Sequence, residues 1–533
     1  MRKKRALAAL LALCLALVLV LPGCQGQEEQ AALYASLMAQ RAAQLPEEPE
    51  PGTWRYLNME PEPGDTLQGE ITVRAYTVGS NVPLLNTLAN EFMFRHPAVK
   101  INVEWVMDYI DFIGTTPEEK AVLRQEFDEE LRLTIATGTA DYVFFDEGSI
   151  DLDVATLSTS GALEDFGPYL REDFPEGFFY EDVLKAFQVD GRQTVLPLSV
   201  SYSSIAFDRA WLEKLGIDEG AVDKVSTTQV MDWYEQALEQ DPELGLFFNS
   251  PPVDQMFDLE RTAYMDLIDR TCTFASEPFV KYLTQLTEIQ NDEPLLEAEA
   301  PEQVGAHSDI DSFSVYHLYQ DTGNLRGDYQ HLASDDDPLF DWVRRRLKVF
   351  TDSKPALAVT DTARPHTVLT QWQPLDYLAG PYPLTNSKGE IGVATSESFL
   401  MPSSMQNKEL AWEFIKYCIG EREDPRIYGN GPIHYYTPYF PINRYNLATM
   451  AEDVTNGEGL GSTSAPFDTG IFGMDPQLYI DAVEELFTGP MVPVEYYEID
   501  TQEFIDEMIL QHFITPEECA EKIQGRATLQ LNE

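Results

Sequence analysis

The sequence predicts an α/β protein built from two large lobes or domains. A chain of 533 residues is too long for a single hydrophobic core. Hydrophobic residues make up 44% of it and aromatic residues 11%, which is the composition of a globular protein rather than a disordered one. Between residues 69 and 146, strand-like and helix-like segments alternate, as they do in an open α/β sheet.

The first strand and helix of this alternation lie in residues 69–97. In "GEITVRAYTVG" the apolar residues Ile71, Val73 and Ala75 alternate with polar ones, which predicts a strand. "NVPLLNTLANEFMFRHP" follows with leucine, phenylalanine and methionine side chains at helical spacing, and Pro97 ends that helix.

The alternation continues through two more strands and a longer helix. "AVKINVEWV" predicts the second strand, and "DYVFFD" predicts the third. Between them, "EEKAVLRQEFDEELRLTIATG" predicts a helix that stops at Gly138.

The N-terminus predicts a secretion signal with a lipid attachment site. Arg2–Arg5 form a basic head, and Leu7–Leu21 form an apolar core shorter than the roughly 20 residues of a membrane span, which is the alternative. The "LPGC" that follows resembles the lipobox of bacterial lipoproteins, in which the cysteine is acylated and becomes the mature N-terminus. The resemblance implies a signal over 1–23 and lipidation of Cys24, so we expect an extracytoplasmic protein on the outer face of the cell membrane.

The segment 24–69 is predicted to be a tether. It contains the Pro-Glu repeats "PEEPEPG" and "EPEPGD", which are extended and solvated.

The formal net charge of the chain is -54, which argues against binding to nucleic acid or wrapping of an anionic membrane. Solubility on a crowded surface explains this charge, and attraction of cationic ligands is the other interpretation.

Cysteine, histidine and acidic residues give no metal or catalytic motif. Three cysteines remain beyond Cys24, far apart in the chain, so we expect free, buried thiols, although one pair is possible. "SYSSIAF" is not a GxSxG motif, and no Gly-rich phosphate loop is present. "ASDDDPLFD" has carboxylates for calcium but lacks the glycine and final glutamate of an EF-hand loop, and a solvated acidic turn is the alternative. We therefore predict that the chain is not an enzyme and that it binds no metal and no cofactor.

Five stretches, in order, resemble extracellular solute-binding proteins of the sugar-binding family 1 type. They are "ANEFMFRHPAVKINVEW", "LRLTIATGTADYVFFD", "VLPLSVSYSSIAFDRAWLEKLGI", "ELAWEFIKYCIG" and "TPEECAEKIQGRATLQLNE". Ala140 stands where that family usually has proline. The resemblance implies a two-lobed, periplasmic-binding-protein-like α/β fold with several strands crossing between the lobes.

The resemblance also implies how the chain is divided between the lobes. We expect crossings near residues 200–207, 355–362 and 391–401. The expected lobes are discontinuous: 70–203 with 357–396, and 204–356 with 397–533.

Ligands in open α/β sheets bind beyond the carboxyl ends of the strands, and sugar sites combine aromatic faces with carboxylates. The strand-end rule selects Phe145, Asp146 and Glu147 after the third strand. Further candidates follow the first strand, lie on the first crossing, or belong to later aromatic segments: Ser80, Asn81, Ser201, Tyr202, Trp372, Tyr435 and Tyr436. For each aromatic residue the alternative is core packing, and for each carboxylate it is a satisfied loop position.

These observations predict the binding component of an ABC importer. We expect its partners to be a small solute, namely a sugar or oligosaccharide, the permease subunits, and the membrane through the lipid. We expect a monomer that does not bind nucleic acid. The alternative is a surface lipoprotein that senses a ligand or adheres to glycan without transport.

Overall fold

The computed structural model describes most of the chain between residues 62 and 532. The described residues are 62, 64–77, 84–107, 115–146, 153–242, 244–247, 252–287, 356–363, 378–420, 440–455, 476–497, 499, 501–509 and 511–532. Among them, no helix has the length and apolar character that crossing a membrane requires.

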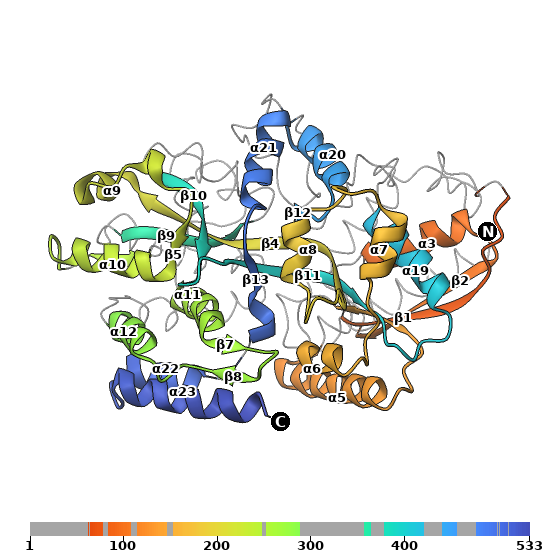
Figure 1. The fold of residues 1–533 in the computed structure, drawn as a ribbon, viewed down its shortest axis with the longest axis horizontal. Helices are drawn as coiled ribbons and strands as arrows, with labels where there is room; N and C mark the ends of the chain where they lie inside the picture. Colours follow the sequence, from red (N-terminus) through yellow and green to blue (C-terminus); the bar gives the residue numbers. More distant parts are fainter. Residues whose placement is uncertain are drawn as a thin grey trace, which may run out of the picture. The chain divides into compact units, whose positions relative to one another are not determined.

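Three parallel strands form one end of a mixed, 11-stranded sheet (Figure 1). They are β1 (Gly69–Thr77), β2 (Val99–Met107) and β3 (Val143–Asp146), in the spatial order β2-β1-β3. Val73 in β1 is level with Val103 on one side and Val143 on the other. The predicted alternation of strands and helices in this part of the chain is therefore confirmed.

Helices cover both faces of this parallel part. On one face lies a hydrophobic cluster that we call the first core, to which α3 (Leu84–Arg95) and α19 (Lys408–Ile419) contribute Phe92 and Trp412. On the other face lies the α5 core, built around Phe127 and Leu131 of α5 (Pro117–Ala136). The remaining helices of this end are α6 (Val154–Thr159), α7 (Gly167–Asp173), α8 (Glu181–Ala186), α20 (Arg444–Thr455) and α21 (Pro476–Leu486).

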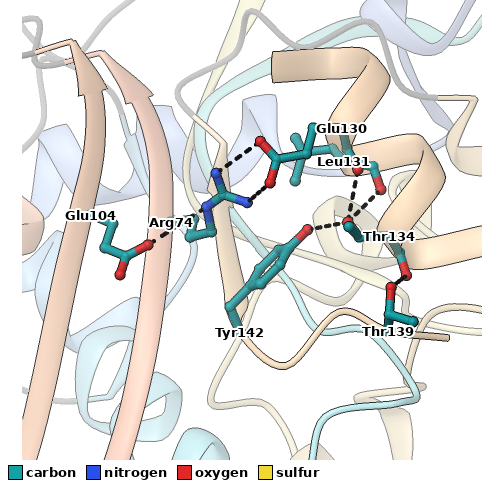
Figure 2. Close-up of polar contacts among 7 residues, drawn as sticks. All are labelled: Arg74, Glu104, Glu130, Leu131, Thr134, Thr139 and Tyr142. Atoms are coloured by element: carbon teal, nitrogen blue, oxygen red, sulfur yellow. Dashed lines mark hydrogen bonds and ion pairs between the residues drawn. The ribbon is translucent and has the colours of Figure 1, made fainter. Parts of the chain in front are cut away.

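A polar network fastens α5 to the sheet (Figure 2). The Arg74 guanidinium on β1 donates to both carboxylate oxygens of Glu130, at 2.9 and 3.3 Å, and lies 5.1 Å from the centre of the Tyr142 ring. The Tyr142 hydroxyl in turn lies 2.6 Å from the Thr134 hydroxyl on α5. A bidentate ion pair stacked on an aromatic ring holds the helix in a defined position on the sheet.

The rest of the sheet is largely antiparallel and is organised around β4 (Val195–Asp208). Its other strands are β5 (Val225–Ser226), β6 (Gly245–Phe247), β9 (Ala356–Ala363), β10 (Leu378–Thr385), β11 (Ile391–Leu400), β12 (Phe440–Pro441) and β13 (Met491–Pro493). The fold class predicted from the sequence, an α/β fold, is confirmed by this helix-covered sheet.

A second core lies against the other end of the sheet. Its largest side chains are aromatic and include Phe207, Tyr234, Phe279 and Tyr282. Its elements are α9 (Arg209–Leu215), α10 (Thr227–Leu238), α11 (Pro252–Arg261), α12 (Glu277–Leu286), α22 (Gln502–Ile509), α23 (Pro516–Gln530), the 3-10 turns η1 (Glu219–Ala221) and η2 (Thr262–Tyr264), and the two-stranded β7 (Met265–Asp266) and β8 (Thr271–Cys272).

Strand β4 passes from one core to the other. Leu196 and Tyr202 are buried in the first core, whereas Ile205 and Phe207 are buried in the second. Residues 200–207, where the sequence analysis expected a crossing, lie within this one continuous strand. Helix α19 packs in the first core with β1, although the sequence-based division placed residues 397–533 with the second lobe. The physical reason is that β11 pairs with β3 and delivers the chain to that side.

The three cysteines in the described part of the chain form no disulfide bond, as expected from the sequence. Cys418 and Cys519 are buried, and Cys272 is half-buried. Burial raises the pKa of the Cys519 thiol to about 12, so this side chain is an inert part of the second core.

Candidate ligand site at converging strand ends

Two strand ends meet on one edge of β11. Strand β3 pairs with residues Ser398–Leu400 of β11 and runs antiparallel to it. Strand β13 pairs with residues Ile391–Val393 on the same edge of β11 and runs parallel to it. The carboxyl ends of β3 and β13 therefore point toward each other, and they converge on residues 394–397 of β11. Convergent carboxyl ends are where α/β sheets place their ligands.

Polar side chains occupy this point. Asp146 is the last residue of β3. Glu495 and Tyr496 belong to the 3-10 turn η4 (Val494–Tyr497), which follows β13 directly. The Glu495 Oε1 atom accepts a hydrogen bond of 3.1 Å from the backbone N–H of Thr395, which fixes the turn to β11. We call Asp146, Ser398, Glu495 and Tyr496 the strand-end cluster.

The Glu495 carboxyl group is poorly ionised in this environment. Burial raises its pKa to about 8, and the negative charge of Asp146 adds to the increase, while the hydrogen bond from the Thr395 N–H opposes it. The residue as a whole keeps partial exposure, but its carboxyl group is surrounded by protein. At neutral pH Glu495 is therefore mostly protonated and can donate a hydrogen bond.

Tyr496 brings a buried hydroxyl to the same point. Its ring packs against both the first core and the α5 core and meets Phe187 edge to face, with ring centres 6.0 Å apart. Burial raises the pKa of the hydroxyl well above its ordinary value, and the charges of Glu495 and Asp146 raise it further. Among the described residues, no group forms a hydrogen bond with this oxygen.

Ser398 adds a second buried hydroxyl without a hydrogen-bond partner in the described part of the chain. The residue is 1% exposed. It lies directly opposite Asp146 in the β3–β11 ladder, and directly opposite residues of an antiparallel pair point to the same face of the sheet. A buried polar atom without a partner costs about 1 to 3 kcal/mol, so two of them beside one carboxylate indicate a site for a further polar group.

The β11 backbone is irregular at this point. Its register against β4 shifts between Ala394 and Glu397 and again between Glu397 and Ser398. The Glu397 backbone N–H donates to the Thr395 hydroxyl at 3.2 Å, and the Ser199 hydroxyl donates to the Glu397 carboxylate at 2.9 Å. Such bulges redirect side chains and are frequent beside functional sites.

Of the ligand-binding candidates predicted from the sequence, one lies in the strand-end cluster, three are buried in the sheet, and the others lie outside the described residues. Asp146 lies in the strand-end cluster. Phe145 is 1% exposed and packs against Phe399 in the first core, which is the alternative that the sequence left open for aromatic residues. Ser201 and Tyr202 are buried in β4, where the Tyr202 ring stacks on Phe440 at 5.7 Å.

The remaining candidates lie outside the described residues and stay predictions: Cys24, Ser80, Asn81, Glu147, Trp372, Tyr435 and Tyr436. The sequence analysis missed Ser398, Glu495 and Tyr496. The segment "VPVEYYEID" carries a weak signal for the last two, because it places acidic and aromatic residues after a short apolar strand.

No metal site is evident in the described ranges, since no three histidine, cysteine or acidic side chains gather there closely enough to hold an ion. The acidic segment around Asp335 lies outside those ranges.

Comparison with known proteins gives structural neighbours only. No family model matches the chain, and no curated protein matches it. Its structure is similar to an extracellular solute-binding protein of family 1 from Alicyclobacillus acidocaldarius, with 13% identity and a TM-score of 0.49 over 88% of this chain and 100% of that one. It is also similar to an ABC substrate-binding protein from Listeria monocytogenes solved with cycloalternan, with 15% identity and a TM-score of 0.45 over 87% and 99% of the two chains.

A third similar structure is a sugar transporter from Rhizobium etli in an open conformation, with 12% identity and a TM-score of 0.45 over 86% and 99% of the two chains. At these identities and TM-scores we take no functional conclusion from the likeness, and the function has to follow from the chain's own residues.

Proposed function

We propose that this chain is a solute-binding protein that captures a carbohydrate for an ABC importer. The observation that carries the proposal is the convergence of β3 and β13 on one edge of β11, with polar side chains at both strand ends. One of these strands belongs to the first core, and the other leads into the second. A ligand at this point touches segments from both cores.

Shared strands supply a mechanism for capture. Because β4 contributes residues to both cores, bending of its middle changes the angle between them without unfolding either one. A ligand that contacts segments of both cores binds most tightly to the conformation in which both contacts are made. It therefore shifts the population of molecules toward that conformation. The permease partner would recognise this conformation, and ATP would be hydrolysed on another protein.

A carbohydrate suits the chemistry of the proposed site. Sugar hydroxyls need both donors and acceptors, and the strand-end cluster offers an aspartate, a mostly protonated glutamate and two hydroxyls. Trp372, Tyr435 and Tyr436 are our candidates for the aromatic faces that cover the apolar side of a sugar ring. We propose binding without turnover, so the chain is not an enzyme in this interpretation.

The test of capture is a thermal-shift screen of the mature chain against mono- and oligosaccharides, amino acids, polyamines and peptides. Ligand at about 100 times its dissociation constant stabilises the native state by about 2.7 kcal/mol. Asp146→Asn should reduce the shift, and Asp223→Asn, an exposed aspartate outside the cluster, serves as the matched control. If no compound stabilises the wild type, or if both variants respond equally, the proposed site is wrong.

The proposed anchor has its own test. Cys24→Ala should abolish labelling by a lipid precursor and release the protein from the membrane fraction. Retention of the label in this variant would refute the anchor and leave the binding proposal unaffected.

A further inference from the structure

We propose that the captured solute carries a protonated amine, which lies between Asp146 and Glu495 and is contacted by the hydroxyls of Ser398 and Tyr496. This inference rests on the proposed function, and it narrows the ligand from carbohydrates in general to amine-bearing saccharides.

The charges around Glu495 favour a cation. The group that acts on it from β3 is Asp146, and β11 contributes the Thr395 N–H. Its neighbour within η4 is the uncharged phenol of Tyr496, which itself is influenced by Glu495 and Asp146. No basic side chain of the described ranges is among the groups that influence either residue. The charged groups that act on Glu495 and Tyr496 in the described ranges are carboxylates, and carboxylates attract a cation.

Two buried hydroxyls provide the remaining contacts. An ammonium group donates three hydrogen bonds and accepts none, so it needs oxygen atoms with free lone pairs. Ser398, at 1% exposure, and Tyr496 each hold a buried oxygen that no described group satisfies. Ser398 shares its face of the sheet with Asp146, and Tyr496 lies close enough to Asp146 and Glu495 to be affected by both charges.

Binding of an amine changes the protonation of Glu495. In the free protein, burial and the charge of Asp146 keep this carboxyl group mostly protonated at neutral pH. A cation between the two carboxylates replaces their repulsion by attraction and favours the ionised form. The proton leaves Glu495 and passes to the buffer as the amine binds. Binding of a neutral saccharide brings no charge to Glu495, so it should release no proton.

The first experiment compares matched pairs of saccharides on the mature chain. Each pair contains an amino-saccharide, such as a glucosamine oligomer of two to six units, and its N-acetylated form, which differs in charge at the same position. We expect the amine form to bind at least about tenfold more tightly, a difference that corresponds to one charge-assisted contact. Equal or tighter binding of the acetylated form overturns the inference while the proposed function stands. Binding of neither form, together with an empty solute screen, counts against both.

The second experiment counts protons. Isothermal titration of the amine ligand at about pH 5.5, where the amine is already protonated, in buffers with different ionisation enthalpies, should show release of a large fraction of one proton. Its affinity should rise as the pH increases from about 5 to about 6, where the amine stays protonated and Glu495 must lose its proton, by up to about tenfold per unit. Glu495→Gln should remove the proton release and weaken binding about tenfold or more, whereas Glu213→Gln, an exposed glutamate on α9, should change neither. No proton release, or an affinity that falls over this pH range, overturns the inference.

Discussion

Two buried carboxyl groups in this chain occupy contrasting positions. Glu260, at the end of α11, is 0% exposed, and its Oε2 atom accepts hydrogen bonds from the Ser387 backbone N–H, at 2.9 Å, and from the Thr227 hydroxyl. Its partners therefore come from the β10–β11 turn and from α10. Glu495 has one backbone donor, a neighbouring carboxylate, and hydroxyls without partners in the described part of the chain.

The contrast separates a structural carboxyl group from a candidate ligand group. Burial raises the pKa of both residues, so a raised pKa alone does not distinguish them. What differs is the origin of their contacts. Donors from two separate segments converge on the Oε2 atom of Glu260 and tie these segments together, whereas Glu495 accepts from the Thr395 N–H at the point where two strand ends converge. The following four predictions test this difference, from the largest expected effect to the smallest.

Removal of the structural carboxyl group should cost stability. Glu260→Ala leaves the Ser387 N–H and the Thr227 hydroxyl buried without their acceptor, and it opens a cavity in the second core. We expect a decrease of about 3 to 5 kcal/mol in the free energy of unfolding, measured with denaturant. Glu260→Gln, which keeps an acceptor oxygen, should lose less. A loss below 1 kcal/mol for the alanine variant would remove the distinction drawn here.

The pH dependence of stability should reveal Glu495. Its pKa in the folded state, about 8, lies above the ordinary value of 4.5, so the folded chain holds a proton that the unfolded chain has already lost. The contribution of this proton to stability is complete below pH 4.5 and disappears as the pH rises through about 8. We expect the free energy of unfolding to fall by a few kcal/mol between about pH 5 and about pH 8.

The control for this pH effect is Glu495→Gln, which cannot titrate and should flatten the profile. Glu260 contributes in the same direction, because its pKa is also raised, so some slope should remain. An unchanged slope in the glutamine variant would show that Glu495 ionises normally.

Removal of a proposed stacking ring should weaken binding and leave stability intact. We expect Trp372→Ala and Tyr436→Ala each to reduce ligand affinity by about 1 to 3 kcal/mol, the scale of one buried aromatic side chain. Calorimetry gives the affinity, and melting curves give the stability. If both variants bind normally, or if both unfold, these rings lie in the core or on the surface and do not face the cluster.

Removal of the unsatisfied hydroxyls should have the smallest effect, and with the opposite sign. Ser398→Ala and Tyr496→Phe each delete a buried polar atom that lacks a partner among the described residues. We expect the ligand-free protein to gain up to about 1 kcal/mol, while ligand affinity falls. Destabilisation by either variant in the absence of ligand would mean that the hydroxyl has a structural partner.

The sequence predicted the early part of the fold well because its signals are local. The alternation of Ile71, Val73 and Ala75, and the glycine that ends α5, depend on neighbouring residues only. The same local rules place Asp146 at a strand end. They did not predict that Phe145 faces the first core, because both faces of "VFFD" are buried and the pattern has no polar side.

The rest of the candidate site depends on pairings between distant segments. Ser398 meets Asp146 only through the β3–β11 ladder, and Glu495 arrives through the pairing of β13 with β11. The same ladders place α19 in the first core, against the sequence-based division. No periodicity within a single segment encodes such a register, which is why the sequence indicated one member of the cluster and missed three.

The position of β11 between β3 and β4 has a consequence for the order of assembly. A chain synthesised from its N-terminus makes β3 and β4 long before residues 391–400, including Phe399 of the first core, exist, and Trp412 of that core comes later still. Contacts this distant in sequence close slowly. The N-terminal half therefore stays incompletely folded until nearly all of the chain has been made. If residues 1–23 act as the secretion signal that the sequence predicts, this delay keeps the polypeptide able to pass unfolded through a translocation channel.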